Sequence, residues 1–320
     1  MRRKINSVLI AMLLFAALPL QVRAEQLLIP VGEVIGLQLQ DNTVTVAAYD
    51  ETLGQCARDA GLKIGDEILK IGNADVSCAE DVRKNLNGEP IDLTVRRGGK
   101  TSTLRLTPEE TPEGPRMGVY LRQGIAGIGT VTFYDPSTGV FGTLGHGVSS
   151  PKGKLLDMKR GYAYEAQLES VKKGSPGEPG QLRGSADAAN AFAALSRNTP
   201  QGVFGVTKRG WKGEGVPVAK YGEIRAGEAA IRCTVCGTAP REYSVEILKI
   251  YPESREDGRN FLLRVTDTEL LEITGGVVQG MSGSPILQDG KLIGAVTHVM
   301  VNDPTTGYGI FIGNMLNAAA

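Results

Sequence analysis

Glycine is the residue that most restricts the fold of this chain. It occurs 42 times in 320 residues and follows no triplet period. Glycine at this level, spread between short apolar segments, is typical of a protein built from many short strands and tight turns. The length suits about two domains. We therefore expect a mostly β protein of two domains.

A targeting segment is predicted at the start of the chain. Three basic residues precede an apolar run over residues 8–20, and small residues at 22 and 24 have the spacing that a signal peptidase reads. The apolar run is shorter than the roughly 20 residues of a membrane-spanning helix. We interpret residues 1–24 as a cleaved secretory signal, with an uncleaved membrane anchor as the alternative. The protein is therefore expected to be exported across the cytoplasmic membrane.

The charge pattern gives no sign of a nucleic-acid or lipid partner. Without residues 1–24 the chain carries 31 basic and 35 acidic side chains, and it has no long basic tract. Such a mildly acidic composition excludes the usual nucleic-acid-binding classes.

The cysteines give only a weak indication of function. Cys56 and Cys78 lie in the same predicted domain, and export would allow them to form a disulfide. Cys233 and Cys236 have CxxC spacing, but one such pair without a second Cys or His pair is weak evidence for zinc. We predict no metal site and no cofactor.

Residues 27–106 are predicted to form one small α+β domain. Residues 42–48 alternate polar and apolar side chains over most of their length, as a half-buried strand does. The last two strands flank a Gly-Gly turn and predict a hairpin. The predicted elements are, in order, a strand at 42–48, helices at 56–60 and 80–86, and strands at 91–96 and 101–106.

The centre of this segment resembles the PDZ family. Residues 57–73 follow the pattern AxxAGLxxGDxILxIxN, the usual central signature of that domain. Residues 34–39 resemble the loop and strand that hold a peptide carboxy-terminus by strand addition. The resemblance therefore assigns peptide binding to Ile35, Gly36, Leu37 and Gln38. A PDZ fold kept only as a structural spacer is the alternative.

A second domain is predicted after a Pro- and Glu-rich linker at 107–116. It runs over residues 117–320, and its Ala-rich segment 185–196 is a candidate helix. Many short strands with few helices predict a β-barrel or a sandwich. The predicted strands lie at 128–133, 203–207, 242–251, 260–266 and 291–301.

The strongest chemical signal is the sequence GMSGSP at residues 280–285. Glycines on both sides allow a tight turn that exposes the Ser282 hydroxyl and points the N–H groups of Gly280 and Ser282 at one spot, as in an oxyanion hole. The segment resembles the GDSGGP nucleophile loop of chymotrypsin-like peptidases, with Met281 and Ser284 as departures. A glycine-serine loop without function is the alternative. By the same likeness, the strand after the next hairpin lines the substrate channel with Thr297, His298 and Val299.

A serine nucleophile needs a general base and a group that orients that base. Of the two histidines, His146 lies in the glycine-flanked sequence LGHG, and we prefer it to His298, which lies in an apolar strand. Asp267 is the predicted orienting carboxylate, with Asp135 and Asp303 as competitors. A structural role for Asp267 is also open, because the surrounding TDTE has the spacing of a helix capping box.

Five stretches look like the stage IV sporulation protein B peptidases, and that family carries the PDZ domain before the peptidase domain. The resemblance covers nearly all of the mature chain and matches the catalytic residues of the family to His146, Asp267 and Ser282. It implies a chymotrypsin-like double β-barrel, self-cleavage, and cleavage of a membrane-bound regulator between the two membranes of a developing endospore. The five stretches are 127–136, 141–148, 274–285, 297–304 and 307–312.

Two other functions remain open. The first is an exported PDZ module that binds peptides and carries an inactive peptidase-like domain. The second is a different hydrolase, such as an esterase. A PDZ domain makes a polypeptide substrate more natural, because such domains bind peptide ends.

Overall fold

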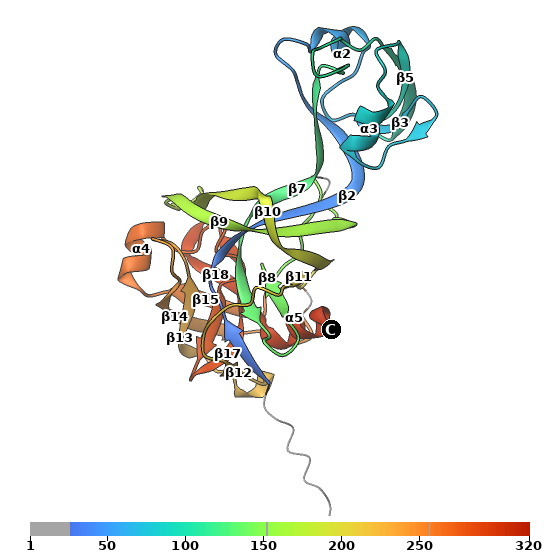
Figure 1. Ribbon diagram of the computed structural model, residues 1–320. Helices are drawn as coiled ribbons and strands as arrows, with labels where there is room; N and C mark the ends of the chain where they lie inside the picture. Colours follow the sequence, from blue (N-terminus) through green and yellow to red (C-terminus); the bar gives the residue numbers. More distant parts are fainter. Residues whose placement is uncertain (1–25, 152, 256) are drawn as a thin grey trace, which may run out of the picture.

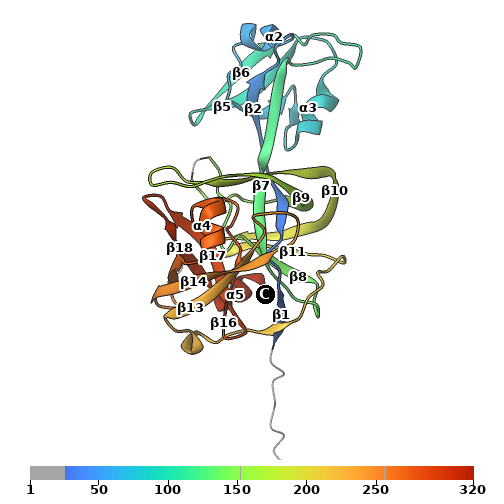
Figure 2. The same ribbon diagram turned by 90° about the vertical axis from the view of Figure 1, so that its left-hand side faces the viewer.

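The structure is a computed structural model that describes residues 26–151, 153–255 and 257–320. Figure 1 shows two β-barrels packed together and a smaller domain that stands away from them on strands β2 (Val34–Tyr49) and β7 (Val119–Tyr134). The turned view in Figure 2 shows β7 rising from the barrels into the small domain. The predicted signal at 1–24 lies outside the described residues. None of the described helices is long and apolar enough to cross a membrane.

The first barrel is a closed ring of antiparallel strands. The ring closes because β2 pairs with β7 along one edge and with β9 along the other. Buried apolar side chains, among them Leu37, Val131 and Phe141, fill its interior. Around the ring the strands are β2, β7, β8 (Val140–Thr143), β11 (Gly202–Val206), β10 (Gln181–Thr199) and β9 (Arg160–Lys172). Two short strands, β1 (Leu27–Pro30) and β12 (Val216–Pro217), extend the sheet beyond β7.

The candidate helix at 185–196 is wrong, because these residues form part of β10. Ala has the highest intrinsic helix propensity, but propensity is a weak preference that tertiary pairing overrides. Here the segment pairs with β9 and with β11, and its register shifts between Ala186 and Ala191. Long-range strand partners therefore decide the conformation of this Ala-rich segment.

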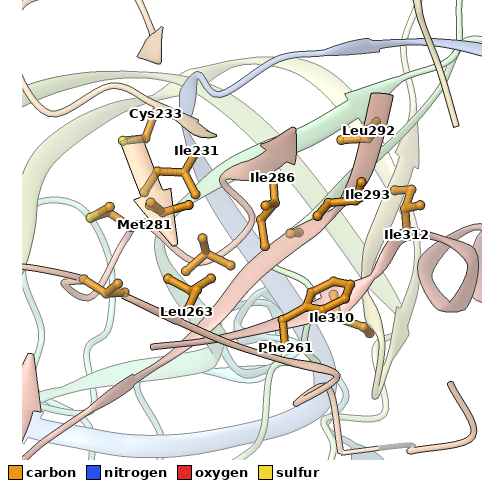
Figure 3. Packing of buried hydrophobic residues seen from close by; sticks show 14 of the residues in the cluster. Ile231, Cys233, Phe261, Leu263, Met281, Ile286, Leu292, Ile293, Ile310 and Ile312 are labelled. Carbon is orange, nitrogen blue, oxygen red and sulfur yellow. The ribbon is translucent and has the colours of Figure 1, made fainter. Parts of the chain in front are cut away.

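The second barrel is also closed, and it holds the largest apolar core of the protein. Figure 3 shows Ile231, Phe261 and Ile286 pointing into this core, together with Met281 from the loop before β16. Helices α4 (Thr268–Thr274) and α5 (Ile312–Ala319) and a 3-10 turn, η1 (Tyr221–Glu223), lie outside the barrel strands. The barrel strands are β13 (Gly227–Cys233), β14 (Arg241–Ile250), β15 (Phe261–Val265), β18 (Asp303–Phe311), β17 (Lys291–Met300) and β16 (Pro285–Gln288).

The small domain has its own core around Leu62, Ile68 and Leu93. A buried carboxylate, Asp66, fixes the glycine turn before β3, since it accepts the Lys63 N–H at 2.8 Å and bonds to the Arg97 guanidinium. Its elements are α2 (Gln55–Asp59), β3 (Glu67–Ile71), β4 (Ala74–Asp75), α3 (Ala79–Asn85), β5 (Ile91–Arg97) and β6 (Lys100–Leu106). The predicted mostly β architecture, with a PDZ domain and a double β-barrel, is confirmed.

Strands β2 and β7 each belong to two cores. Residues 35–39 of β2 contribute to the core of the first barrel, whereas Val44 and Val46 contribute to the core of the PDZ domain. In β7, Val119 and Leu121 at the start of the strand pack on the PDZ core, and the later residues of β7 belong to the first barrel. The cores therefore divide the chain differently from the sequence prediction, which assigned 27–39 to the PDZ domain and 117–123 to the peptidase domain.

Candidate active site

Ser282 lies on a tight turn between α4 and β16. Gly280 has φ +97° and Gly283 has φ +95°, both in the left-handed region where L side chains are strained. Met281, a departure from the usual Asp, buries its side chain completely in the core of the second barrel. The turn is therefore anchored by an apolar side chain, and Ser282 stays half-buried at the junction with the first barrel.

Strand β7 of the first barrel holds this turn in place. The Thr130 hydroxyl donates to the Gly280 carbonyl at 2.8 Å, and the Thr130 N–H donates to the Ser282 carbonyl at 3.0 Å. The buried Thr132 hydroxyl donates to the Gly283 carbonyl at 2.7 Å. These three hydrogen bonds fix the nucleophile turn of one barrel against a strand of the other.

The two predicted oxyanion donors are free. Gly283 N–H donates to the Val296 carbonyl and Met281 N–H to the Val278 carbonyl. The N–H groups of Gly280 and Ser282 have no acceptor within the described part of the chain. Backbone donors that are held in place and unpaired are what a developing oxyanion requires.

The Ser282 hydroxyl donates to the Thr297 carbonyl of β17 at 2.8 Å. Among the described residues, no hydrogen bond joins it to His146. A serine that attacks a carbonyl must hand its proton to a base. The hydroxyl must therefore turn away from the Thr297 carbonyl before the reaction.

His146 follows β8 and reaches the same part of β17. Gly145, with φ +67°, lies against Thr297, and the His146 and His298 rings are 5.3 Å apart. The Nδ1 of His146 is 3.0 Å from the Gly147 carbonyl, so this nitrogen carries the proton and Nε2 carries the lone pair. Burial lowers the pKa of His146, which keeps the imidazole neutral and able to act as a base near pH 7.

Beyond Thr297, one edge of the predicted substrate strand has no partner strand among the described residues. On its other edge His298 pairs with Tyr308, and Val299 pairs with Gly307, but the pairing of β16 with β17 ends at Ala295. The Thr297 side chain is buried and donates to the Gly258 carbonyl at 2.8 Å. A substrate would therefore meet the backbone of this strand and not the side chain of Thr297.

His298 is the second histidine of the site. Its Nδ1 is buried and has no hydrogen-bond partner in the described residues. Burial, then the neighbouring His146 and Arg259, lower the pKa of His298 to about 4. A neutral imidazole beside His146 can accept a hydrogen bond.

Asp267 does not contact His146 in this structure. It is the N-cap of α4, where its side chain accepts the N–H of Leu270 at 3.0 Å and that of Ser244 at 3.3 Å. The structural alternative for Asp267 is therefore observed, but with Asp267 and not Thr266 as the N-cap, and a role for Asp267 in catalysis stays a prediction. The two competitors are engaged locally as well, Asp135 by Ser137 and Asp303 by the two threonines that follow it.

The loop between β14 and β15 was missed by sequence reasoning. Its Gly258 carbonyl binds Thr297, and the charge of Asp257 raises the pKa of His298, against the larger effects that lower it. Arg259 lies over the Tyr308 ring, 5.2 Å from its centre. The sequence ESREDGRN reads only as a polar turn, so no local signal places it beside the histidines.

The predicted peptide-binding residues of the PDZ domain are wrongly placed. Ile35, Gly36, Leu37 and Gln38 pair with β7 on one edge and with β9 on the other. Strand addition requires an unpaired edge. These four residues lie inside the first barrel and cannot accept a peptide strand.

The four cysteines are free thiols. Burial raises the pKa of Cys233 well above its usual range, because the thiolate would lose its hydration. Within the described ranges there is no group of three or more His, Cys, Asp or Glu residues that could hold a metal ion.

Comparison with known families gives two matches. The sequence model described as SpoIVB peptidase S55 matches residues 113–316, and the model of the PDZ domain matches residues 33–107. The first match spans well over half of the chain. The chain therefore consists largely of a peptidase S55 domain preceded by a PDZ domain.

Curated relatives match over short segments. A candidate zinc metalloprotease of Agrobacterium fabrum is 38% identical over 77 residues, 23% of this chain and 20% of the relative. A second candidate zinc metalloprotease, from Nostoc, is 31% identical over 102 residues, which are 30% of this chain and 28% of the relative. A candidate serine protease of Synechocystis is 38% identical over 64 residues, 19% of this chain and 15% of the relative. The chain thus spans less than a third of each relative.

Among solved structures, the Rv3671c protease of M. tuberculosis is similar in two forms. The active form has a TM-score of 0.37 at 16% identity, and the match covers 61% of this chain and 73% of the Rv3671c chain. The inactive form has a TM-score of 0.35 at 13% identity, and the match covers 60% of this chain and 84% of the Rv3671c chain.

Proposed function

Because the chain belongs to the SpoIVB peptidase S55 family, we propose that it is an endopeptidase that cleaves itself and a membrane-associated regulatory protein during sporulation signalling. The basic and apolar start of the sequence supports export, and we place the protein outside the cytoplasmic membrane, in the space between the forespore membranes. Its PDZ domain would bind a polypeptide end on the substrate or on a regulator.

One observation carries the proposal of peptide cleavage. The turn around Ser282 is bonded to β7 and presents a hydroxyl and two unpaired N–H groups, and the neutral imidazole of His146 lies against β17, the strand that the hydroxyl contacts. These are the parts that acyl transfer requires: a nucleophile, a base and donors for the oxyanion.

The reaction follows from this arrangement. The Ser282 oxygen attacks the peptide carbonyl carbon while Nε2 of His146 takes the hydroxyl proton. The N–H groups of Gly280 and Ser282 stabilise the negative oxygen of the intermediate. The C–N bond then breaks, the leaving amine takes the proton from His146, and water hydrolyses the acyl-enzyme by the same steps.

The test compares the wild type with Ser282→Ala. We expect mass spectrometry to find self-cleavage products and a fluorophosphonate adduct on wild type alone, because removal of the nucleophile costs more than about a thousandfold in rate. Ser254→Ala, a change of an exposed serine on the β14–β15 loop, is the control and should retain both. Equal self-cleavage by wild type and Ser282→Ala would contradict the proposal.

A second candidate is an exported PDZ module with an inactive peptidase domain. The bond between Ser282 and the Thr297 carbonyl and the position of Asp267 at α4 favour it, since no hydrogen bond joins either side chain to His146. This function predicts that fluorophosphonate fails to label Ser282 in a folded protein.

A further inference from the structure

A pocket lies beside the nucleophile turn, on the outer face of the first barrel. Gly36 and Gln38 of β2 alternate with the buried core residues of that strand and therefore face outwards into it. Strands β2 and β7 form the floor of the pocket, and β9 and β10 form its wall. Its volume is about 510 Å³, which is enough for a large side chain.

The wall of the pocket reaches the nucleophile turn. Residues 166–172 of β9 pair with residues 181–186 of β10 in a two-stranded β9–β10 ribbon. Figure 1 and Figure 2 both show β9 and β10 between the PDZ domain and the strands of the second barrel. The Leu182 N–H donates to the Gln279 carbonyl at 2.8 Å, and a Cβ on Gly280 would stand 2.9 Å from the Leu182 Cβ. The ribbon therefore touches the residue that carries one of the candidate oxyanion donors.

The edge of β7 beside the pocket leads to Ser282. On this edge the Thr130 N–H donates to the Ser282 carbonyl. Alternate residues of an antiparallel strand direct their backbone groups to the same edge, so Ile128 and Ala126 present N–H and C=O groups in line with Thr130. The partner on this edge, β8, pairs with β7 only at residues 131–134, and no other described strand covers it. A polypeptide bound at Ser282 can therefore continue along this edge as an added strand.

The pocket is suited to an apolar side chain. The buried Leu182 forms part of its wall. Two of its polar groups bond to each other, because the Tyr164 hydroxyl donates to the Gln38 side chain at 2.8 Å. The other charged side chains of the pocket, Glu169 and Arg183, are exposed and opposite in sign, so the pocket has no net charge to select a charged group. An apolar side chain gains burial here without leaving a polar partner unpaired.

We propose that this pocket binds a large apolar side chain of the substrate, at the first or second residue after the bond that is cleaved. The substrate pairs with β7 at residues 126–128, and its residue opposite Ile128 directs its side chain to the pocket face of the sheet. Strand β17 lies at the Ser282 hydroxyl and β7 at the Ser282 carbonyl, so the residues before the bond fall on β17 and those after it on β7. The assignment rests on the proposed function, since only cleavage at Ser282 defines a leaving half.

The test maps the cleavage sites of the full-length wild type in a mixture of random-sequence peptides, with Ser282→Ala as the background control. Mass spectrometry should find Phe, Leu or Met enriched at the first or second position after the cut. Two peptides that differ only by Phe or Ala at that position then give a ratio of kcat/KM. This ratio should be at least about tenfold, the order that an apolar pocket discriminates, and it does not depend on the fraction of active enzyme.

Two variants fill the pocket from opposite sides. Ala126→Leu fills it from β7, and Ala186→Leu fills it from the ribbon, where the Ala186 Cβ stands over Gly36. Each should lower the Phe-to-Ala ratio at least about fivefold, because an occupied pocket rejects the larger side chain. Ala191→Leu, the same change at an exposed position of β10 outside the pocket, is the matched control and should keep the ratio. Urea unfolding identifies the variants that fold.

The two proposals fail in different ways. A wild type that does not react with fluorophosphonate, a reagent without a peptide leaving half, would contradict the proposed function and this assignment with it. A wild type that reacts with fluorophosphonate but shows no apolar preference after the cut would overturn this assignment alone. An unchanged Phe-to-Ala ratio in a folded, filled variant would overturn it as well.

Discussion

Gly283 is the residue whose replacement tests the nucleophile turn most directly. A Cβ at Gly283 would overlap the Thr130 carbonyl oxygen and stand 2.5 Å from the Leu144 nitrogen. Both atoms are backbone, so no rotation of a side chain relieves the overlap. Gly283→Ala must therefore move the turn away from β7 or move β7 itself.

The expected cost has two parts. A residue with a Cβ at φ +95° loses about 1–2 kcal/mol relative to glycine. Overpacking adds about 1–3 kcal/mol. We expect the free energy of unfolding to fall by about 2–5 kcal/mol, and the labelling rate of Ser282 to fall about a hundredfold, as for a misplacement of about 1 Å.

Gly290→Ala is a matched control, because Gly290 has φ +73° but no atom within 4 Å of the added Cβ. It should show only the first part of the cost and a normal labelling rate. Urea unfolding and fluorophosphonate labelling measure the two quantities. Equal unfolding free energies for the two variants, or normal labelling of Gly283→Ala, would refute the close contact between the barrels.

Three further changes test other parts of the structure. Burial lowers the pKa of His146 and keeps this base unprotonated, so the labelling rate should fall only below pH 6.5 as the pH is lowered; a fall that begins at or above pH 6.5 contradicts the burial of the His146 ring. Asp267→Ala should lower the free energy of unfolding by about 1 kcal/mol through loss of the α4 cap, and Asp267→Asn should restore it; equal losses would exclude the cap. Replacing the buried Asp66 with Ala should cost about 3 kcal/mol, because the Lys63 N–H and Arg97 lose their acceptor, and a cost within experimental error in urea unfolding would show that the ion pair is not formed.

The sequence predicts those features that are local. The turn around Ser282, the hairpins and the central PDZ signature each depend on residues a few positions apart, and the structure has these elements in the expected places. Their glycines are readable because only glycine adopts positive φ without strain. The alternation of polar and apolar residues marks strands in the same way.

The features that sequence reasoning missed depend on distant partners. Residues 35–38 alternate as any strand does, and only their pairing with β7 and β9 assigns them to a barrel. Asp267 has the same local sequence whether it caps a helix or orients a histidine.

Strand β7 connects both functional parts of this protein. Its first residues pair with β2 in the PDZ domain, and residues ten further on bond to the Gly280 and Ser282 carbonyls. Those two residues also carry the candidate oxyanion donors, so a shift of β7 along its axis changes the direction of their N–H groups. The ladder between β7 and β2 is interrupted between these two regions, because its register shifts from Leu39 to Val44 and Gly124 of β7 has φ +74°. A displacement of β7 in the PDZ domain therefore has no unbroken ladder through which to reach the nucleophile turn.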